Sequence, residues 1–118
     1  MVNDILTASG VPYRRGRFTA KKENPTYAVY TDDISTELSP DGIPISVLTH
    51  AITVELYEDA PDDATEAAVE AAIMAAGLQW EKTDRVWLQS EQQYAVFYMF
   101  SYIEKRRVYA WQNVTRTP

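Results

Sequence analysis

Hydrophobic and polar residues alternate most regularly in the segment ISVLTHAITVELYED, and this two-residue period predicts a β-strand. Ile52, Val54 and Leu56 share its apolar face. The run TYAVYTD at 26–32 is rich in β-branched and aromatic residues, which favours a second strand. Between these runs, residues 33–44 contain the turn sequence SPDG and are predicted to form the long loop of a hairpin. Long loops in compact domains are often functional, so this loop is a candidate contact segment.

Another strand pattern covers residues 93–104, with the sequence QYAVFYMFSYIE. One face of this strand carries Tyr94, Val96, Tyr98, Phe100 and Tyr102. The other face is also largely apolar, which is typical of a central strand covered on both sides. Because only two helices are predicted, one face of the strand is a candidate surface for another subunit.

The helical period of 3.6 residues is clearest in APDDATEAAVEAAIMAAG, residues 60–77. Pro61 suits the first turn of this helix, the acids near it suit the positive end, and Gly77 ends it. The segment NDILTAS is predicted to form a short first helix, with Asn3 as its N-cap. Gly10 follows this helix as a stop.

The remaining segments complete an α+β domain. PYRRGRFT, residues 12–19, is predicted to be an edge strand, because it is only half apolar and carries basic side chains. A further strand is expected within 78–88. The order is therefore α–β–β–β–α–β–β, a mostly antiparallel sheet of about five strands with two helices on one face, in a single domain of residues 1–118. Residues 108–118 are expected to add either one more strand or an extended C-terminal arm.

Charge is distributed very unevenly along the chain, whose formal net charge is −6. Five of the eleven basic residues lie between Arg14 and Lys22, whereas thirteen acids and no basic residue occupy the stretch from Glu23 to Glu81. A long acidic stretch repels phosphate and argues against general or sequence-specific nucleic-acid binding. Opposite charge patches on one small protein suit head-to-tail contact between identical subunits, which closes into a ring when the rotation allows.

The basic run has three interpretations: a solvated strand edge, a phosphate contact, or a contact with acidic protein. The phosphate contact is the weakest of these, because no aromatic base reader is interleaved with the arginines. We favour a protein contact, with the solvated edge close behind. Arg14, Arg15 and Arg17 are accordingly candidates for an intersubunit contact.

Sequence motifs for catalysis or metal binding are weak. The chain has no cysteine, so disulfides, thiolate metal sites and cysteine nucleophiles are excluded. His50 is the only histidine, and nothing in the sequence specifies a nucleophile or an orienting partner for it, which favours a structural or surface histidine. The acids at 32–33 and 59–63 lack calcium-loop spacing. We therefore expect no enzyme activity, no cofactor and no metal.

Two further patterns concern location. The N-terminal segment MVNDILTASG has no basic region followed by an apolar stretch, and no apolar run approaches the roughly 20 residues of a membrane helix. We expect a soluble protein made in a cytosol, without membrane contact.

The layout as a whole resembles the tail terminator proteins, also called tail completion or head–tail joining proteins, of long-tailed bacteriophages with non-contractile tails. The resemblance covers nearly the full chain. It is carried by ILTASGVPY, NPTYAVY, ITVELYED and the closing pattern AAIMAAGLQWEKTDRVWLQSEQQYAVFYMFSYIEK. The segment after Arg107 is longer than is usual in this family.

The resemblance implies a structural phage or prophage protein without an active site. Such proteins form a ring, usually a hexamer, on the head-proximal end of the tail tube, where they end tube polymerisation and dock onto the head. The implied partners are further copies of the chain, the major tail tube protein and a head-completion or connector protein. The implied location is the virion, after a period in the host cytoplasm.

Charge and loop length add candidate contacts to that interpretation. Glu37 and Asp41 in the predicted loop are candidates for contact with a neighbouring subunit or the tube, and Tyr98, Phe100 and Tyr102 are candidates on the aromatic strand. The competing hypothesis is a small acidic inhibitor or regulatory module that binds one basic protein. The acidic block supports this alternative, whereas the tyrosine-rich strand does not.

Overall fold

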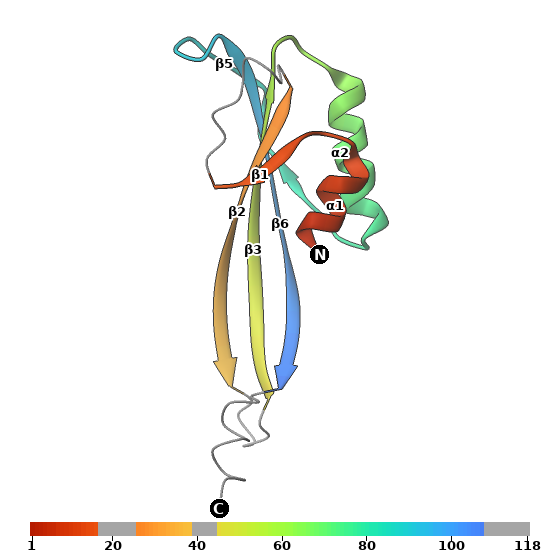
Figure 1. The fold of residues 1–118 in the computed structure, drawn as a ribbon, viewed down its shortest axis with the longest axis vertical. Coiled ribbons are helices and arrows are strands. Elements are labelled where there is room, and N and C mark those ends of the chain that lie inside the picture. The colour runs from red at the N-terminus through yellow and green to blue at the C-terminus, as the bar shows by residue number, and fades with distance from the viewer. Residues whose placement is uncertain (17–25, 39–44, 108–118) are drawn as a thin grey trace, which may run out of the picture.

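Two helices lie on one face of a mixed six-stranded sheet in the computed structural model, which describes residues 1–16, 26–38 and 45–107 (Figure 1). The predicted α+β class and the order of its elements are confirmed. The elements are α1 (Val2–Ser9), β1 (Tyr13–Arg15), β2 (Tyr27–Leu38), β3 (Ile45–Glu58), α2 (Asp63–Ala75), β4 (Glu81–Lys82), β5 (Val86–Leu88) and β6 (Gln93–Arg107).

The strands are arranged in the spatial order β1-β2-β3-β6-β4, and β5 also pairs with β6. All pairs are antiparallel except β1 with β2, which is parallel. The sheet is therefore mostly antiparallel, as predicted, and β1 is the exception. A three-residue strand carries no local pattern that fixes its direction; here backbone bonds from Ala28 N to Pro12 O and from Gly16 N to Tyr30 O hold it beside β2.

The three long strands β2, β3 and β6 run past the helices and extend far beyond them (Figure 1). The molecule measures 61 × 27 × 22 Å, and its radius of gyration of 18.0 Å exceeds the roughly 13.5 Å of a compact domain of this length. We call the extended part, residues 31–38, 45–51 and 101–107, the distal ribbon. The rest of the described chain is the body.

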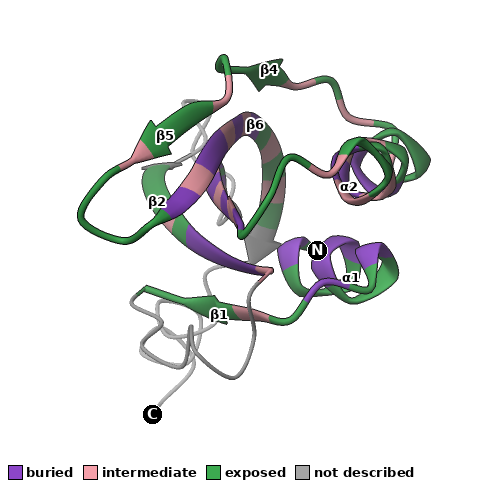
Figure 2. Cartoon of the chain, turned by 90° about the horizontal axis from the view of Figure 1, so that it is seen from above, coloured by how far each residue is buried: buried purple, intermediate pink, exposed green. Residues whose placement is uncertain are grey.

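The core lies in the body, between the helices and one face of the sheet (Figure 2). The even-numbered residues of β2, β3 and β6 face the helices, as the strand register requires. The buried apolar residues of this core are Val2, Ile5, Leu6, Val11, Ala28, Tyr30, Ile52, Val54, Leu56, Val69, Ala72, Ile73, Val96, Tyr98 and Phe100. The face assignment made from the alternation in β3 and β6 is thus confirmed.

The helix ends differ in how well the sequence predicted them. Asp62 caps α2, because its carboxylate accepts hydrogen bonds from Thr65 N at 3.0 Å and Thr65 Oγ1 at 2.7 Å. The Asn3 cap predicted for α1 is wrong, since the helix already begins at Val2. The Asn3 side chain instead accepts a hydrogen bond from Tyr30 Oη at 3.0 Å and ties α1 to β2.

Half of the predicted hairpin loop is strand, because β2 continues to Leu38 and contains all of residues 33–38. The other half, residues 39–44, lies outside the described residues. Residues 33–38 lack a regular hydrophobic–polar alternation because they belong to the distal ribbon. The ribbon extends beyond the helices, so neither of its faces is covered by a helix and neither has to be apolar. The predicted strand within 78–88 is split into β4 and β5, and Leu78 and Trp80 pack against the core from the segment that precedes β4. The predicted C-terminal arm, residues 108–118, lies outside the described residues.

Candidate functional site

The predicted aromatic contacts divide between the core and its margin. Tyr98 is fully buried and Phe100 is nearly so, and both lie in the core beneath the helices. A partner cannot reach these two rings without opening the core. Tyr102 is half-buried and lies farther along β6, where its ring stacks on that of His50 with centroids 4.5 Å apart. Tyr102 is therefore the one predicted aromatic contact that lies in the distal ribbon.

The predicted charged contacts lie elsewhere on the sheet. Arg14 and Arg15 are exposed on β1, in register with Val29 and Tyr30 of β2. Glu37 lies near the end of β2, opposite Val47 of β3. Arg17 and Asp41 lie outside the described residues. Among the described residues the predicted contacts are not gathered into one patch, because Arg14 and Arg15 lie beside the start of β2 and Glu37 lies near its end.

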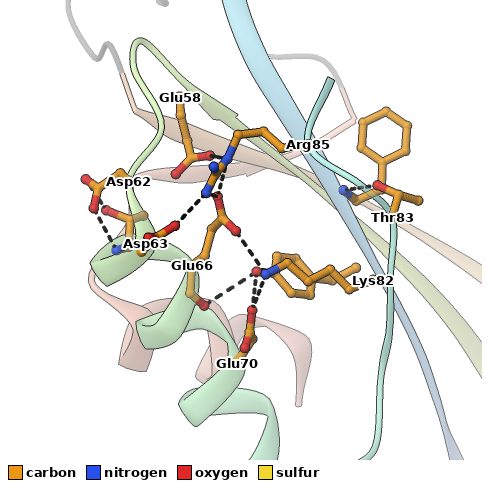
Figure 3. Close-up of polar contacts among 11 residues, drawn as sticks. Glu58, Asp62, Asp63, Glu66, Glu70, Lys82, Thr83 and Arg85 are labelled. Carbon is orange, nitrogen blue, oxygen red and sulfur yellow. Dashed lines mark hydrogen bonds and ion pairs between the residues drawn. The ribbon is translucent and has the colours of Figure 1, made fainter. Parts of the chain in front are cut away.

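A cluster of buried and half-buried charges, which the sequence analysis did not anticipate, joins α2 to the segment that contains β4 and β5 (Figure 3). Glu66 stands at its centre. Its carboxylate accepts a hydrogen bond from Arg85 Nε at 2.8 Å and lies 2.9 Å from Lys82 Nζ. Arg85 Nη2 also donates to Asp63 Oδ1 at 2.8 Å, and Lys82 Nζ donates to Glu70 Oε2 at 2.7 Å.

Two further groups extend this charge cluster into the core. The Glu58 carboxyl is fully buried, with Oε1 3.6 Å from Arg85 Nε. Tyr98 Oη donates to Glu70 Oε2 at 2.7 Å, so a core tyrosine is anchored to the outer layer of the cluster. Lys82 Nζ also lies 5.5 Å from the centre of the Tyr98 ring, within cation–π range.

The protonation of the cluster follows from burial and from the neighbouring charges. Burial raises the pKa of Glu58 to about 8, the adjacent Glu66 carboxyl adds to this shift and Arg85 opposes it. Burial would also raise the pKa of Glu66, but the adjacent Glu58 carboxyl and the hydrogen-bonded Lys82 and Arg85 cations lower it below its usual value. Burial therefore favours the protonated form of Glu58, and Glu66 is the anion that the two cations bind.

The sequence did contain a weak signal for this cluster. Glu66 and Glu70 are four residues apart and share the helical face of Val69 and Ile73, where an acid is unusual. Lys82 and Arg85 are also the first basic residues after the long acidic stretch. Their pairing across 12 to 19 residues of chain has no local signature, so only the fold shows it.

A second charged group crosses the start of the distal ribbon. His50, which is buried in β3, faces Asp32 of β2 with Nδ1 at 2.9 Å from Oδ2, and faces Glu104 of β6 with Nε2 at 2.9 Å from Oε1. Burial disfavours the imidazolium, but the hydrogen bonds to Asp32 and Glu104 outweigh this and raise the pKa of His50. One side chain thus ties all three strands together.

The His50 contacts make stability depend on pH. Unfolded histidine has a pKa of about 6.5, and the folded value is higher, so the His50 contribution is complete below the unfolded pKa and is lost as pH rises through the folded pKa. We expect the difference in urea midpoint between the natural protein and His50→Gln to shrink from about pH 6 to about pH 9. The pKa of Glu58 is also raised, so Glu58 too makes stability depend on pH. Both proteins contain Glu58, so its contribution cancels in the difference between their urea midpoints. An equal difference at both pH values would contradict this assignment.

The chemistry of these groups is that of structural ion pairing. Both ring nitrogens of His50 face carboxylates, and the described residues place no nucleophile on the ring. Within the same described ranges, no group of three or more His, Asp or Glu is arranged to hold a metal ion. No helix in that part of the chain is long and apolar enough to cross a membrane.

Together these features define an α+β protein with a helix-covered body, internal charge clusters and a long three-stranded ribbon. No family model and no curated protein matches the sequence. The fold is similar to that of a chain in the solved structure described as "Virion of native gene transfer agent (GTA) particle". The match has a TM-score of 0.53 at 15% sequence identity and covers 82% of this chain and 81% of that chain. At this identity the likeness is one of fold.

Proposed function

We propose that this protein is a structural component of a phage-like virion and that it acts without catalysis. The observation that carries this proposal is the shared fold, which spans most of both chains and matches a protein found in a virion particle. The geometry supports it, because the charge clusters are used internally as ion pairs and the most distinctive surface is an extended ribbon. A long ribbon with little core is suited to contact with other proteins rather than to enclosing a substrate.

The more specific proposal is a tail terminator. In this role a ring of six identical subunits caps the head-proximal end of the tail tube, stops its growth and joins it to the head. The sequence resemblance to that family supports this choice, and so does the uneven charge that favours head-to-tail contact. The partners are other copies of the chain, the tail tube protein and a head connector protein, and the location is the head-proximal end of the tail.

Gold-labelled antibody against this protein tests its location on particles from a lysate of the source phage or prophage. We expect label at one end of detached tails and at the head–tail junction of complete particles. Antibody against the tail tube protein serves as the control and labels the whole tube. Label distributed along the tube, or absent from all particles, would contradict the terminator role.

The acidic binding module remains the second candidate, and one observation favours it. Lys82 and Arg85, the basic residues of the middle of the chain, are engaged by acids of α2. Exposed acids next to them in the sequence, such as Glu81 and Asp84, therefore set the charge of that surface. A particle-free distribution in the antibody experiment would move this candidate to first place.

A further inference from the structure

The distal ribbon has two long outer edges. β1 pairs with β2 only as far as Tyr30, and β4 pairs with β6 only as far as Met99. Beyond these two residues, no strand in the described part of the chain pairs with the outside of β2 or of β6. Long strand edges carry backbone donors and acceptors that can pair with another strand, so they are natural sites for a further chain.

The two edges carry opposite charge. The outer part of β2 contains the acids Asp33 and Glu37, and the outer part of β6 ends in the bases Lys105, Arg106 and Arg107. Asp33 and Lys105 are exposed. When two copies meet, two acidic edges repel each other, and so do two basic edges, whereas an acidic edge attracts the basic edge of another copy. This favours a head-to-tail contact over a symmetric one.

The register places complementary residues at the same level. Through β3, Glu37 is aligned with Val47 and then with Lys105. In the same way Ile34, which is 48% exposed, is aligned with His50 and then with Tyr102. If two ribbons lie side by side without an axial shift, Glu37 of one copy falls beside Lys105 of the next, and Ile34 falls beside Tyr102.

We propose that the β2 edge of one copy pairs with the β6 edge of a second copy through their distal ribbons. This inference rests on the ring in the proposed function and names its interface. β2 and β6 are both antiparallel to β3, so they run in the same direction. Around a ring whose axis follows the ribbons this direction is kept, and the new pairing is parallel.

The ribbon is braced for such a contact. The ion pairs of His50 with Asp32 and Glu104 connect its three strands close to where it leaves the body.

Apolar side chains also lie at both edges. Ile103 is 65% exposed on the face of β6 opposite to Tyr102, and it is aligned through Thr49 with Ser35 of β2. An exposed isoleucine beside each edge gives the contact apolar area in addition to charge.

Charge reversal tests the pairing in a phage that lacks the natural gene. The first variant reverses the β2 edge (Asp33→Lys with Glu37→Lys), the second reverses the β6 edge (Lys105→Glu with Arg107→Glu), and the third carries all four changes. We expect each single-edge variant to lower the yield of complete particles at least tenfold, and the fourfold variant to restore it because its edges are complementary again. Asp59→Lys with Glu91→Lys makes the same charge change as the first variant on the body and is expected to act like the natural protein.

A cross-linking experiment reads the contact directly, because the natural chain has no cysteine. Ser35→Cys and Ile103→Cys together place thiols at one level on opposite edges, two strand spacings apart and too far for a bond within one chain. We expect oxidation to give a ladder of covalent oligomers from the double variant, in purified protein or in isolated tails, and at most dimers from either single variant.

The two experiments separate the interface from the function. A ladder together with normal tails after deletion of the gene would refute the terminator role and keep the interface. Another set of results would refute the interface and keep the role. In that case deletion gives overlong tubes, neither sample gives a ladder, and the single-edge variants are fully active. Unchanged urea midpoints for the edge variants show that they remain folded.

Discussion

Replacing Glu66 by alanine is expected to lower the free energy of unfolding by about 2–4 kcal/mol at neutral pH. Glu66 is the buried anion that Lys82 and Arg85 share, and removing one partner of a buried ion pair leaves the other charges uncompensated, at a typical cost of about 3–5 kcal/mol. The expected value is smaller because the side chains of Lys82 and Arg85 are 35% and 27% exposed, so water screens them. Urea unfolding followed by circular dichroism measures the change.

Asp63→Ala is the matched control for this experiment. Asp63 binds the same guanidinium at 2.8 Å, but its side chain is 96% exposed. Exposed ion pairs contribute about 0–1 kcal/mol, so this variant should unfold almost like the natural protein. Equal losses from the two substitutions would show that burial of Glu66 does not determine the strength of the cluster.

Replacing Ile73 by alanine is expected to cost about 2–5 kcal/mol, the usual range for truncating a buried isoleucine. Ile73 is fully buried where α2 packs against the sheet, and α2 is the longer of the two helices that cover the core. Its removal leaves a cavity that neighbouring backbone cannot fill by itself. Thermal and urea unfolding should both report the loss.

Met74 offers a control one position along the same helix. Its side chain is 63% exposed, and Met74→Ala changes helix propensity only slightly, so we expect a change within about 0.5 kcal/mol. If Met74→Ala were as costly as Ile73→Ala, the orientation of α2 on the sheet would have to be different.

The body of the fold could be predicted because its pattern is local. Alternation in β3 placed Ile52, Val54 and Leu56 on one apolar face, and the structure buries all three in the core. The helical period and the acidic N-terminus likewise located α2, although it begins at Asp63 rather than at residue 60. These patterns involve residues only a few positions apart, and they are regular because the residues on one face must be apolar to be buried in the core.

The distal ribbon and the charge cluster could not be predicted in the same way. Ser35 and Thr36 in β2 lie on the ribbon beyond the helices, both are exposed, and no alternation identifies them as strand residues. The ion pairs of Glu66 with Lys82 and Arg85 join segments that only the fold brings together. The sequence placed Tyr98 among the candidate assembly contacts. In the structure its ring is enclosed by α2 and the core, and its hydroxyl donates a hydrogen bond to Glu70.

Electron microscopy of lysates from the source phage or prophage, with and without this gene, tests the central claim most directly. If the protein ends tail growth and joins the tail to the head, deletion should give full heads separated from abnormally long tubes. The natural gene supplied in trans should restore complete particles with tails of normal length. Normal particles in the absence of the gene would contradict the proposed function.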